Sequence, residues 1–406
     1  MNPPLRILLF STLYPSAARP NHGIFVETRL KQLLASGQVE VRVVAPVPWF
    51  PSPHPRFGQY AVFARTPKQE TRSGIAIQHP SYPLLPKIGM SIAPFLLAIW
   101  AIPTLRRLQA EGYDFDLIDA HYFYPDGVAA MLLGWYFNKP LVITSRGTDI
   151  SFIPQFTLPR RLIQWAANRA DGLITVCEAL RNELINLDIS PDKVTTLRNG
   201  VDLELFHPID RVAQRVSFGW TGFTLLSVGN LIPVKGHDLT IKALVQLPDV
   251  TLVIAGGGAG LANLKALAQR LGVGERVFFV GVLPQSELVL YYGAADVLVL
   301  ASSREGWANV LLESMACGTP VIATRVWGTP EVVAAPAAGL LMEARSSDSL
   351  AAAVRTLQRN YPDRAATRRY AEGFDWQETT AGQLRLFRAI LKRRQDLKVR
   401  QEAGHA

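Results

Sequence analysis

The sequence predicts an α/β protein built from two doubly wound, parallel-sheet domains of the Rossmann type. Its 406 residues exceed the size at which one hydrophobic core usually stops growing, roughly 250–300 residues. Short apolar runs alternate with amphipathic segments along most of the chain, which is typical of parallel strands covered by helices on both faces. The alternation stops near residue 206 and then begins again. We therefore expect a first domain over residues 1–205 and a second over residues 206–376.

Apolar runs in the first half predict strands, and amphipathic helices lie between most of them. The predicted strands are residues 6–11, 39–45, 117–120, 141–144, 173–176 and 194–197. Residues 46–86 hold many of the prolines and show no clear helix, so we interpret them as a loop-rich insertion. The polar stretch 203–220 has no strong strand pattern, and we place the linker there.

A second set of strands and helices follows the linker. The predicted strands are residues 224–228, 251–255, 277–280, 297–301 and 320–323, and the predicted helices are residues 236–246, 261–271, 284–294 and 309–317. Gly318 and Pro320 end the last of these helices by the expected rule, glycine first and proline soon after. A final helix is expected over residues 377–394, where apolar residues approximate a helical stripe.

Two carboxylates in residues 297–324 are the most informative feature of the chain. Glu305 lies in a short polar loop after an apolar strand, and Glu313 lies on the helix that follows. Open α/β sheets bind ligands at the carboxyl ends of their strands, and helix N-termini attract anions through free N–H groups. Carboxylates accept hydrogen bonds from hydroxyls, so the segment fits a polyhydroxylated, phosphorylated ligand such as a sugar nucleotide.

The glycine-rich turn at residues 255–260 invites a dinucleotide-binding interpretation. Counting GxGxxG from Gly256 puts Leu261 at the third glycine, and the strand that ends at Val280 supplies no acidic residue for a ribose. We interpret the turn as a tight connection from strand to helix.

The composition is that of a globular protein, with 49% apolar and 18% charged residues. Cys177 and Cys317 lie far apart in apolar patterns, which indicates buried thiols in a reducing compartment. The apolar run near the N-terminus is too short for the core of a signal peptide, so it is expected to be a buried strand.

The net charge of +9 comes partly from a basic C-terminal tail, with Arg388, Lys392, Arg393, Arg394, Lys398 and Arg400. No zinc-finger spacing, helix-turn-helix pattern or aromatic-interleaved basic stripe accompanies it, so we expect no nucleic-acid partner. An anionic membrane leaflet would attract such a tail. A solvated helix end is the alternative.

Residues 88–105 form an uncharged run about as long as a membrane span. Pro94 and Pro103 are expected to break it, and no second run of that length exists. We expect a buried helix. The alternative is an interfacial helix flanked by Lys87 and by Arg106 and Arg107, which would suit an acceptor in a lipid bilayer.

Several segments together resemble the retaining glycosyltransferases of family 4, which have the GT-B fold. The main one is EGWANVLLESMACGTPVIAT, residues 305–324, preceded by YYGAADVLVLASSR. Other matching segments are residues 23–26, 120–121, 125–127, 146–149, 199–202, 228–230 and 235–236. The resemblance implies two Rossmann-like domains that face a central cleft. It also implies that residues 377–406 cross back to complete the N-terminal, acceptor-binding domain.

The resemblance assigns donor-binding roles to residues of the C-terminal domain. Glu305 would accept hydrogen bonds from the donor sugar, and Glu313 would hold the nucleotide ribose. Lys235 would neutralise the departing phosphate, a task that other transferases give to a metal. The backbone N–H groups expected near the sugar or the diphosphate belong to Trp307, Ala308, Asn309 and Val310. We expect no metal and no cofactor besides the nucleotide sugar.

One residue departs from the family pattern. Asn230 stands where members commonly have an arginine, so neutralisation of the diphosphate would depend more on Lys235 and the helix dipole. Arg146, which replaces a histidine of the family, is a candidate for the missing charge. Its alternative role is a structural pair with Asp149.

Two residues of the N-terminal domain complete the expected site. A lone histidine is usually a satisfied loop or core residue, but the motif context assigns His121 contacts to the donor sugar or reaction centre. Gly23 would let the backbone approach the diphosphate, and it also suits the turn before a helix.

The expected activity is retaining transfer of a sugar from a nucleotide-diphosphate donor to a saccharide or lipid-linked acceptor. Cell-surface polysaccharide or glycolipid synthesis in the cytoplasm, at the cytoplasmic face of the membrane, would suit the basic tail and the apolar run. The alternatives are another GT-B enzyme, such as a sugar-nucleotide epimerase or a phosphorylase, and an inactive GT-B binding subunit. A phosphorylase would need a lysine suited to pyridoxal phosphate, and none stands out.

Overall fold

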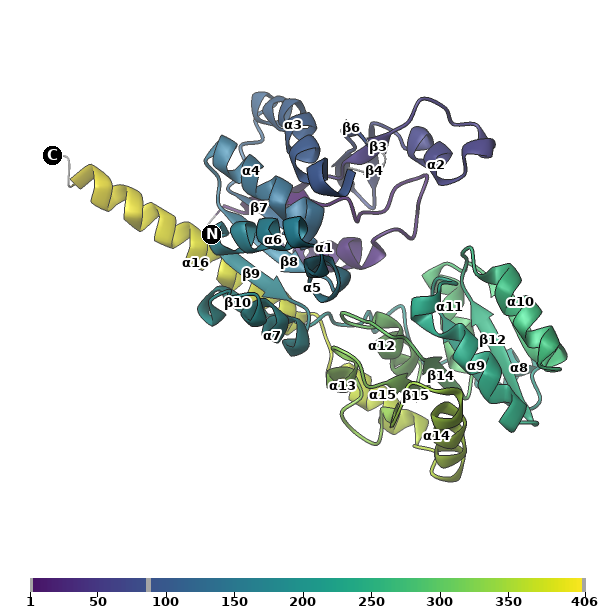
Figure 1. Cartoon of the computed structure of the whole chain (residues 1–406). Helices are drawn as coiled ribbons and strands as arrows, with labels where there is room; N and C mark the ends of the chain where they lie inside the picture. Colours follow the sequence, from purple (N-terminus) through teal and green to yellow (C-terminus); the bar gives the residue numbers. More distant parts are fainter. Residues whose placement is uncertain (1–2, 85–88, 404–406) are drawn as a thin grey trace. The chain divides into compact units, whose positions relative to one another are not determined.

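The computed structural model describes residues 3–84 and 89–403, and it separates into two compact α/β units (Figure 1). The first unit contains Met1–Leu197 and Gln377–Ala406, and the second contains Arg198–Trp376. The border lies earlier in the chain than residue 205. Residues after Leu197 join the second unit because the Val201 N–H donates to the Phe374 carbonyl, 2.9 Å away.

The first unit is built on a sheet with strand order β10-β9-β8-β7-β1-β2-β5-β4. All neighbouring strands are parallel except β4 and β5. The strands are β1 Leu5–Phe10, β2 Val39–Val44, β4 Gln69–Arg72, β5 Ile75–Gln78, β7 Leu117–His121, β8 Leu141–Ser145, β9 Gly172–Thr175 and β10 Val194–Thr196. The strand order reverses between β1 and β7, which makes the loops after these two strands the expected ligand site of a doubly wound sheet.

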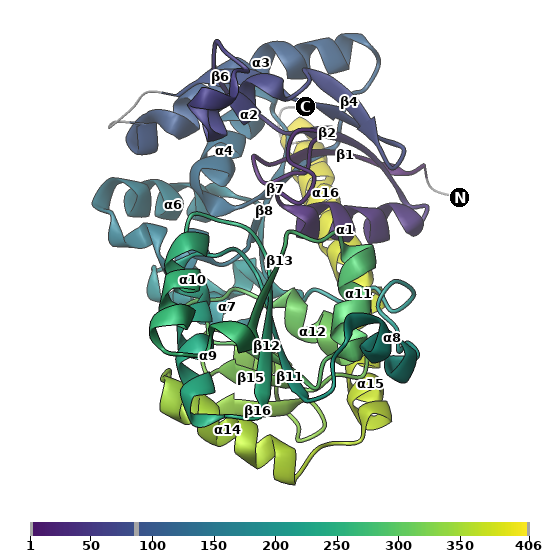
Figure 2. The ribbon, with the colours of Figure 1, turned by 90° about the vertical axis from the view of Figure 1, so that its right-hand side faces the viewer.

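Helices cover both faces of this sheet (Figures 1 and 2). Leu30 of α1 and Phe387 and Ile390 of α16 belong to one buried cluster with Ile7 and Val142 of the sheet. The helices α3, α4 and α6 contact one another in a separate group. The helices of the unit are α1 Ile24–Ala35, α2 Gln59–Arg65, α3 Gly89–Ala110, α4 Val128–Phe137, α5 Thr148–Ser151, α6 Thr157–Arg169, α7 Glu178–Asn186 and α16 Gln377–Ala403.

The prediction that residues 46–86 contain no helix is wrong, although residues 85 and 86 lie outside the described part. The segment contains the helix α2 and a small parallel sheet of β3 Val47–Trp49 and β6 Ser81–Pro83. It also contains the antiparallel hairpin β4–β5, whose turn residues Ser73 and Gly74 both have positive φ angles. These elements are too short to show a clear period in the sequence.

The expectation that Pro94 and Pro103 break the run 88–105 is also wrong. From Gly89 onward the run belongs to one helix, α3, which continues through both prolines to Ala110; residues 87 and 88 lie outside the described part. Leu97, Ala101 and Leu105 are buried along one side of α3. Tertiary packing therefore outweighs the low helix propensity of proline here.

The second unit is built on a fully parallel sheet with strand order β13-β12-β11-β14-β15-β16. The strands are β11 Phe223–Val228, β12 Val250–Ala255, β13 Val277–Gly281, β14 Val297–Leu300, β15 Val321–Thr324 and β16 Gly339–Met342. Of these, the edge strand β16 has no counterpart among the predicted strands. The strand order reverses between β11 and β14, which are neighbours.

Two groups of helices accompany this sheet. The helix α9 contacts α10 and α14, whereas α12 contacts α11 and α15, and α8 contacts α11. The bounds are α8 Arg211–Phe218, α9 His237–Ala243, α10 Leu261–Arg270, α11 Gln285–Ala294, α12 Asn309–Ala316, α13 Thr329–Val332, α14 Ser347–Arg359 and α15 Arg364–Glu372. The helix α8 lies in the stretch interpreted as a linker; Asp210 caps it, and none of its residues is buried.

Candidate functional site

Lys235 and Glu305 meet where the strand order of the second unit reverses. Lys235 ends a 3₁₀ turn, Pro233–Lys235, in the loop after β11, and Glu305 lies in the loop after β14. Lys235 Nζ lies 2.7 Å from Glu305 Oε1, and both side chains keep some exposure to solvent. The two residues were predicted to act on neighbouring parts of one ligand, and the structure brings them together at the ligand-binding edge of the sheet.

Backbone contacts hold these two loops in place. The Ser303 N–H donates to the Val234 carbonyl over 2.8 Å. Gly236 has a φ of +70°, and a Cβ there would lie 2.2 Å from the Ala301 carbonyl oxygen, so only glycine fits this approach. Arg345 Nε donates to the same carbonyl over 2.9 Å. The sequence did not predict this contact of Arg345, because no motif surrounds the residue.

The helix α12 begins directly after the Glu305 loop. Its N-cap residue, Ala308, has no side-chain acceptor for the N–H groups of the first turn. Trp307 is buried with its ring 6.1 Å from that of Phe374, and Asn309 Oδ1 accepts a hydrogen bond from Asn199 Nδ2 over 3.2 Å. These contacts fix the start of a helix whose first N–H groups suit an anion. The Asn309 N–H donates to the Trp307 carbonyl over 3.1 Å in the free protein, so an anion would have to replace this contact.

Glu313 lies one turn further along α12 and is buried. Its Oε2 accepts a hydrogen bond from the Tyr292 hydroxyl over 2.8 Å, and Gln285 Nε2 lies 3.5 Å from its Oε1. Burial raises the pKa of Glu313 to about 7, against the lowering effect of the hydrogen bonds from Tyr292 and Gln285. The carboxyl group therefore titrates near neutral pH.

Asn230 follows β11 beside the glycine-rich turn and is exposed. A Cβ at Gly256 would lie only 1.9 Å from the Gly229 carbonyl oxygen, and the Leu231 N–H donates to the Gly257 carbonyl over 2.9 Å. The glycines therefore allow the turn after β12 to pack directly on the backbone after β11. The interpretation as a tight connection from strand to helix is confirmed, since α10 begins at Leu261.

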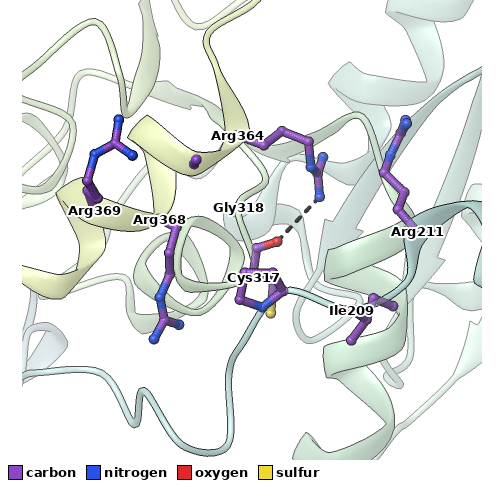
Figure 3. A pocket seen from close by; sticks show the side chains of 9 residues that line it. Ile209, Arg211, Cys317, Gly318, Arg364, Arg368 and Arg369 are labelled. Atoms are coloured by element: carbon purple, nitrogen blue, oxygen red, sulfur yellow. Dashed lines mark hydrogen bonds between the residues drawn. The ribbon is translucent and has the colours of Figure 1, made fainter.

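A cavity of about 300 Å³ lies at the opposite end of α12 (Figure 3). Four arginines line it, and each has a partner in the second unit. Arg211 pairs with Asp296 and Arg369 lies 3.8 Å from Asp363, whereas the other two donate to backbone carbonyls. Arg364 Nη2 donates to the Cys317 carbonyl and Arg368 Nη1 to the Ala316 carbonyl, at 3.4 and 2.7 Å. Cations at a helix C-terminus satisfy its free carbonyls and oppose its dipole. The cavity is thus part of the support that holds α12.

Of the site residues expected in the first unit, His121 is the last residue of β7, Arg146 directly follows β8, and Gly23 lies between β1 and α1. His121 is 1% exposed, and its Nε2 lies 3.2 Å from Asp119 Oδ2, while its Nδ1 is hydrogen-bonded to Arg146 Nη2. The guanidinium group is a donor only, so Nδ1 accepts and Nε2 carries the proton that is donated to Asp119. Burial lowers the pKa of His121 to about 4. His121 is therefore a neutral imidazole in one tautomer.

Arg146 is 9% exposed and connects His121 to the start of α1. Its guanidinium carbon lies 5.4 Å from the centre of the Phe25 ring. Gly23 lies two residues before Phe25 in the chain. Gly23 has a φ of +69°, and a Cβ on it would lie 2.3 Å from the Leu13 carbonyl oxygen. The predicted residues Gly23, His121 and Arg146 are thus neighbours at the point where the first sheet reverses its strand order.

Two buried carboxylates hold the loops of this region. Asp126 accepts hydrogen bonds from the Thr12 N–H and hydroxyl, both at 2.9 Å. Asp149 accepts from the backbone N–H groups of Phe123, Gly147 and Arg146. The suggested Arg146–Asp149 pair therefore includes the backbone of Arg146, while the guanidinium group donates to His121.

Within residues 3–84 and 89–403, no group of three or more His, Cys, Asp or Glu side chains could hold a metal ion. The two cysteines are free and buried, as expected from their apolar surroundings. The chemistry of the second unit's site is that of a cation, two carboxylates and a helix N-terminus. This set matches the phosphates and hydroxyls of a sugar nucleotide.

Comparisons with known proteins agree with this chemistry. Residues 211–374 match the family model of glycosyl transferases group 1, and residues 25–205 match that of glycosyltransferase family 4. The D-inositol 3-phosphate glycosyltransferase of Frankia alni is 32% identical over 366 residues, which cover 82% of this chain and 88% of that protein. The Mycobacterium marinum protein of the same name is 31% identical over 73% of this chain and 69% of its own length.

The chain belongs to the group 1 glycosyltransferases of family 4. The resemblance seen in its motifs is thereby confirmed, and the protein is a glycosyltransferase. Sucrose-phosphate synthase from Thermosynechococcus elongatus has the same fold, with a TM-score of 0.79 over 96% of this chain and 99% of that one at 22% identity. Anabaena Alr3699/HepE in complex with UDP gives a TM-score of 0.72 at 20% identity, over 95% of this chain and 100% of its own. The predicted GT-B architecture of the glycosyltransferase is thus confirmed.

Proposed function

We propose that this glycosyltransferase moves a hexose from a nucleoside-diphosphate donor to an acceptor hydroxyl, without a metal and with retention of the anomeric configuration. The observation that carries the proposal is the Lys235–Glu305 pair at the reversal point of the second sheet, 2.7 Å between Nζ and Oε1. A cation and a carboxylate placed together there fit a ligand that carries a phosphate next to a hydroxyl-bearing ring.

Each donor group has a proposed partner in the second unit. Lys235 takes the phosphate next to the sugar, and the N–H groups of Asn309 and Val310 take the diphosphate at the start of α12. Glu305 accepts hydrogen bonds from the sugar hydroxyls, with Trp307 and Ala308 beside it. Glu313 accepts from the ribose hydroxyls, and Tyr292 holds its other oxygen, 2.8 Å away. In this proposal Asn230, which is exposed, donates an amide hydrogen bond to a phosphate oxygen.

The proposed reaction breaks the bond between the anomeric carbon and the phosphate oxygen through an oxocarbenium-like transition state. A bond from that carbon to the acceptor oxygen forms on the same face, and the acceptor proton passes to the departing phosphate oxygen. Negative charge grows on the leaving group during this step, and Lys235 with the α12 N–H groups stabilises it. His121 in its neutral form is a hydrogen-bonding group in this scheme and not a proton acceptor. The contacts of Gly23, His121 and Arg146 with the donor remain predictions.

We propose a saccharide or lipid-linked acceptor, as in the synthesis of a cell-surface polysaccharide or glycolipid. A phosphorylated polyol is the second candidate, because relatives that match most of the chain carry the name D-inositol 3-phosphate glycosyltransferase. The two candidates give different products. A lipid-linked product partitions into an organic phase, whereas a glycosylated polyol phosphate stays in water.

A panel of UDP-, GDP- and ADP-sugars tests the donor by thermal unfolding. A donor at a hundred times its dissociation constant should stabilise the protein by about 2.7 kcal/mol. Hydrolysis or transfer with that donor is then followed by proton NMR, where an axial anomeric product from an axial donor demonstrates retention. Stabilisation without any turnover would support the inactive binding subunit, and an epimerised sugar nucleotide would support the epimerase. Absence of stabilisation by every donor would overturn the proposal.

A further inference from the structure

The first unit presents an exposed apolar face on two adjoining helices. The face consists of Phe95, Ile99 and Trp100 of α3 and Trp135 and Tyr136 of α4. Ile99 is 56% exposed and Trp135 is 81% exposed. Scattered apolar residues are common on protein surfaces, but here five large ones are exposed on two helices that pack on each other, which is typical of an interaction site. We call these five residues the α3–α4 face.

The opposite side of α3 is packed in the first unit. Leu97, Ala101 and Leu105 are buried, whereas Phe95 and Ile99, four positions apart, point outward. In the part of the chain that the structure describes, α3 is the one helix long and apolar enough to cross a membrane, and only 33% of its most apolar window is buried. Its packing against α4 indicates a helix that lies along a surface.

Two arginines contact the C-terminal end of α4. The Arg106 guanidinium of α3 donates to the Tyr136 hydroxyl and lies 5.3 Å from the centre of its ring. Arg394 of the basic helix α16 donates to the carbonyl of Asn138, the C-cap residue of α4, over 3.1 Å. The end of α4 therefore joins the apolar residues of α3 to the basic helix, and α3, α4 and α16 are all seen in Figure 1.

Acidic groups near the α3–α4 face are paired and do not cancel this charge. Glu111 lies 3.8 Å from Arg107, and Asp114 lies 2.8 Å from Lys139. Residues 388–402 of α16 contain six basic residues and two acidic ones, Asp396 and Glu402. The basic residues are Arg388, Lys392, Arg393, Arg394, Lys398 and Arg400. The face thus combines exposed aromatic and aliphatic side chains with a surplus of positive charge.

We propose that the α3–α4 face and the basic end of α16 dock the first unit on an anionic lipid bilayer. Trp135, Ile99 and Phe95 would enter the boundary between headgroups and acyl chains, and the basic side chains would contact anionic headgroups. Amphipathic aromatic side chains favour this boundary. The inference does not depend on the donor or acceptor, because the surface lies entirely within the first unit.

Vesicle binding tests the proposal without donor or acceptor. The full-length protein is sedimented with vesicles of phosphatidylcholine that contain about one third phosphatidylglycerol, and with vesicles of phosphatidylcholine alone. We expect binding to the anionic vesicles, weakened by salt because charges near the surface are screened over about 10 Å at 0.1 M ionic strength. Absence of binding to anionic vesicles would overturn the proposal, and the transfer activity would be untouched by that result.

Two double variants separate the apolar and the charged contribution. Ile99→Ser with Trp135→Ser should lower binding to anionic vesicles at least tenfold, because both side chains are exposed and would leave the bilayer boundary. Lys392→Glu with Lys398→Glu should lower it at least tenfold as well and should weaken its salt dependence. Both pairs are exposed, so thermal unfolding should be unchanged.

Matched controls lie on the second unit. Val212→Ser with Val216→Ser removes two exposed apolar residues of α8, and Arg270→Glu with Arg359→Glu reverses two exposed cations. Both controls should bind vesicles like the wild type. Equal loss in variants and controls would contradict the proposal. If Ile99→Ser with Trp135→Ser instead converts a dimer to a monomer in light scattering, a second copy covers the face and the bilayer proposal is overturned.

Discussion

Lys235 Nζ lies 2.7 Å from Glu305 Oε1, so the two charges expected to act on different parts of the donor pair with each other in the free protein. Their side chains are 25% and 11% exposed, which leaves the pair open to exchange with a ligand. Donor binding would give each partner a new contact, phosphate for Lys235 and sugar hydroxyls for Glu305. The ion pair therefore holds both side chains at the site before the ligand binds.

Loss of the cation should slow the reaction much more than it weakens donor binding. We expect Lys235→Ala to lower kcat by about 10²–10³-fold, since it removes a group that stabilises charge formed in the transition state. Steady-state kinetics with the identified donor measure the effect. Lys242→Ala is the control, because Lys242 is an exposed lysine paired with Asp238 on α9 of the same unit. Equal kcat values in both variants would contradict the assigned role.

Loss of the Glu305 charge should strengthen binding of the nucleotide and lower the rate of sugar transfer. In Glu305→Gln, Lys235 loses its ion pair and is free for phosphate, so the nucleoside diphosphate alone should bind several-fold more tightly. Turnover should still fall, by at least about tenfold, because the sugar hydroxyls lose a charged acceptor. Isothermal titration and kinetics measure the two effects. Glu275→Gln, at an exposed residue, should change neither, and weaker nucleotide binding in Glu305→Gln would contradict the explanation.

Glu313 should make the protein less stable as the pH rises. Burial raises its pKa from the ordinary value of 4.5 to about 7 in the folded protein. Between these values the folded state holds a proton that the unfolded state has released, so the free energy of unfolding falls with pH. The loss from this group is about 3 kcal/mol in total and is complete above the folded pKa.

Glu313→Gln removes this titration. The free energy of unfolding of the variant, relative to the wild type, should therefore increase from pH 5 to pH 8, by up to about 3 kcal/mol. Urea unfolding of both proteins at the two pH values gives the difference, in which the other titrating groups cancel. A constant difference across this pH range would show that Glu313 ionises normally in the folded state.

Gly23 should tolerate no side chain. Gly37, which has nearly the same φ angle, should tolerate alanine. Gly23 has φ +69° and lies against the Leu13 carbonyl, while Gly37 has φ +67° and open space around it. Gly37→Ala should cost about 1 kcal/mol, the strain of the left-handed conformation alone. Gly23→Ala should cost at least about 3 kcal/mol, because the backbone must also move. Chemical denaturation of both variants measures the costs, and equal values would mean that the loop 13–23 adapts freely.

Gln383 should stabilise the first unit through two buried hydrogen bonds. Its amide accepts from Arg29 Nε over 3.0 Å and donates to Asp119 Oδ2 over 2.9 Å, the same oxygen that His121 contacts. Gln383→Leu should cost about 2–4 kcal/mol, since it leaves buried charged groups without these partners. Gln395→Leu, at an exposed position of the same helix, should stay within about 0.5 kcal/mol.

A second readout separates packing from positioning in Gln383→Leu. If Gln383 holds the Asp119 carboxylate against His121, the nitrogen NMR shift of His121 Nε2 should differ between the wild type and the variant, because its acceptor has moved. The Nδ1 atom accepts from Arg146 in both proteins and should stay unprotonated. An unchanged Nε2 shift would mean that Gln383 only packs α16 against the sheet.

Long apolar strands and the helices between them were predictable because their period and length are local properties. Most expected strands differ from the observed ones by a residue or two at their ends. The elements that were missed include α2 and the hairpin β4–β5 of the insertion and the edge strand β16. In α3, the prolines suggested a break that packing on the first unit prevents. The residues Lys235, Glu305 and Glu313 could be named because each stands in a motif.

The sequence by itself determined that this protein is an α/β glycosyltransferase with two parallel-sheet domains, and it predicted donor-binding residues in the segments after β11 and β14. The tertiary structure decided how those residues are paired and buried, because charge pairing and burial arise only when distant segments meet. It pairs Lys235 with Glu305 and raises the pKa of Glu313 by burial. It also places His121 between Asp119, a near neighbour in the sequence, and Arg146, which is 25 residues away and reaches His121 only through the fold.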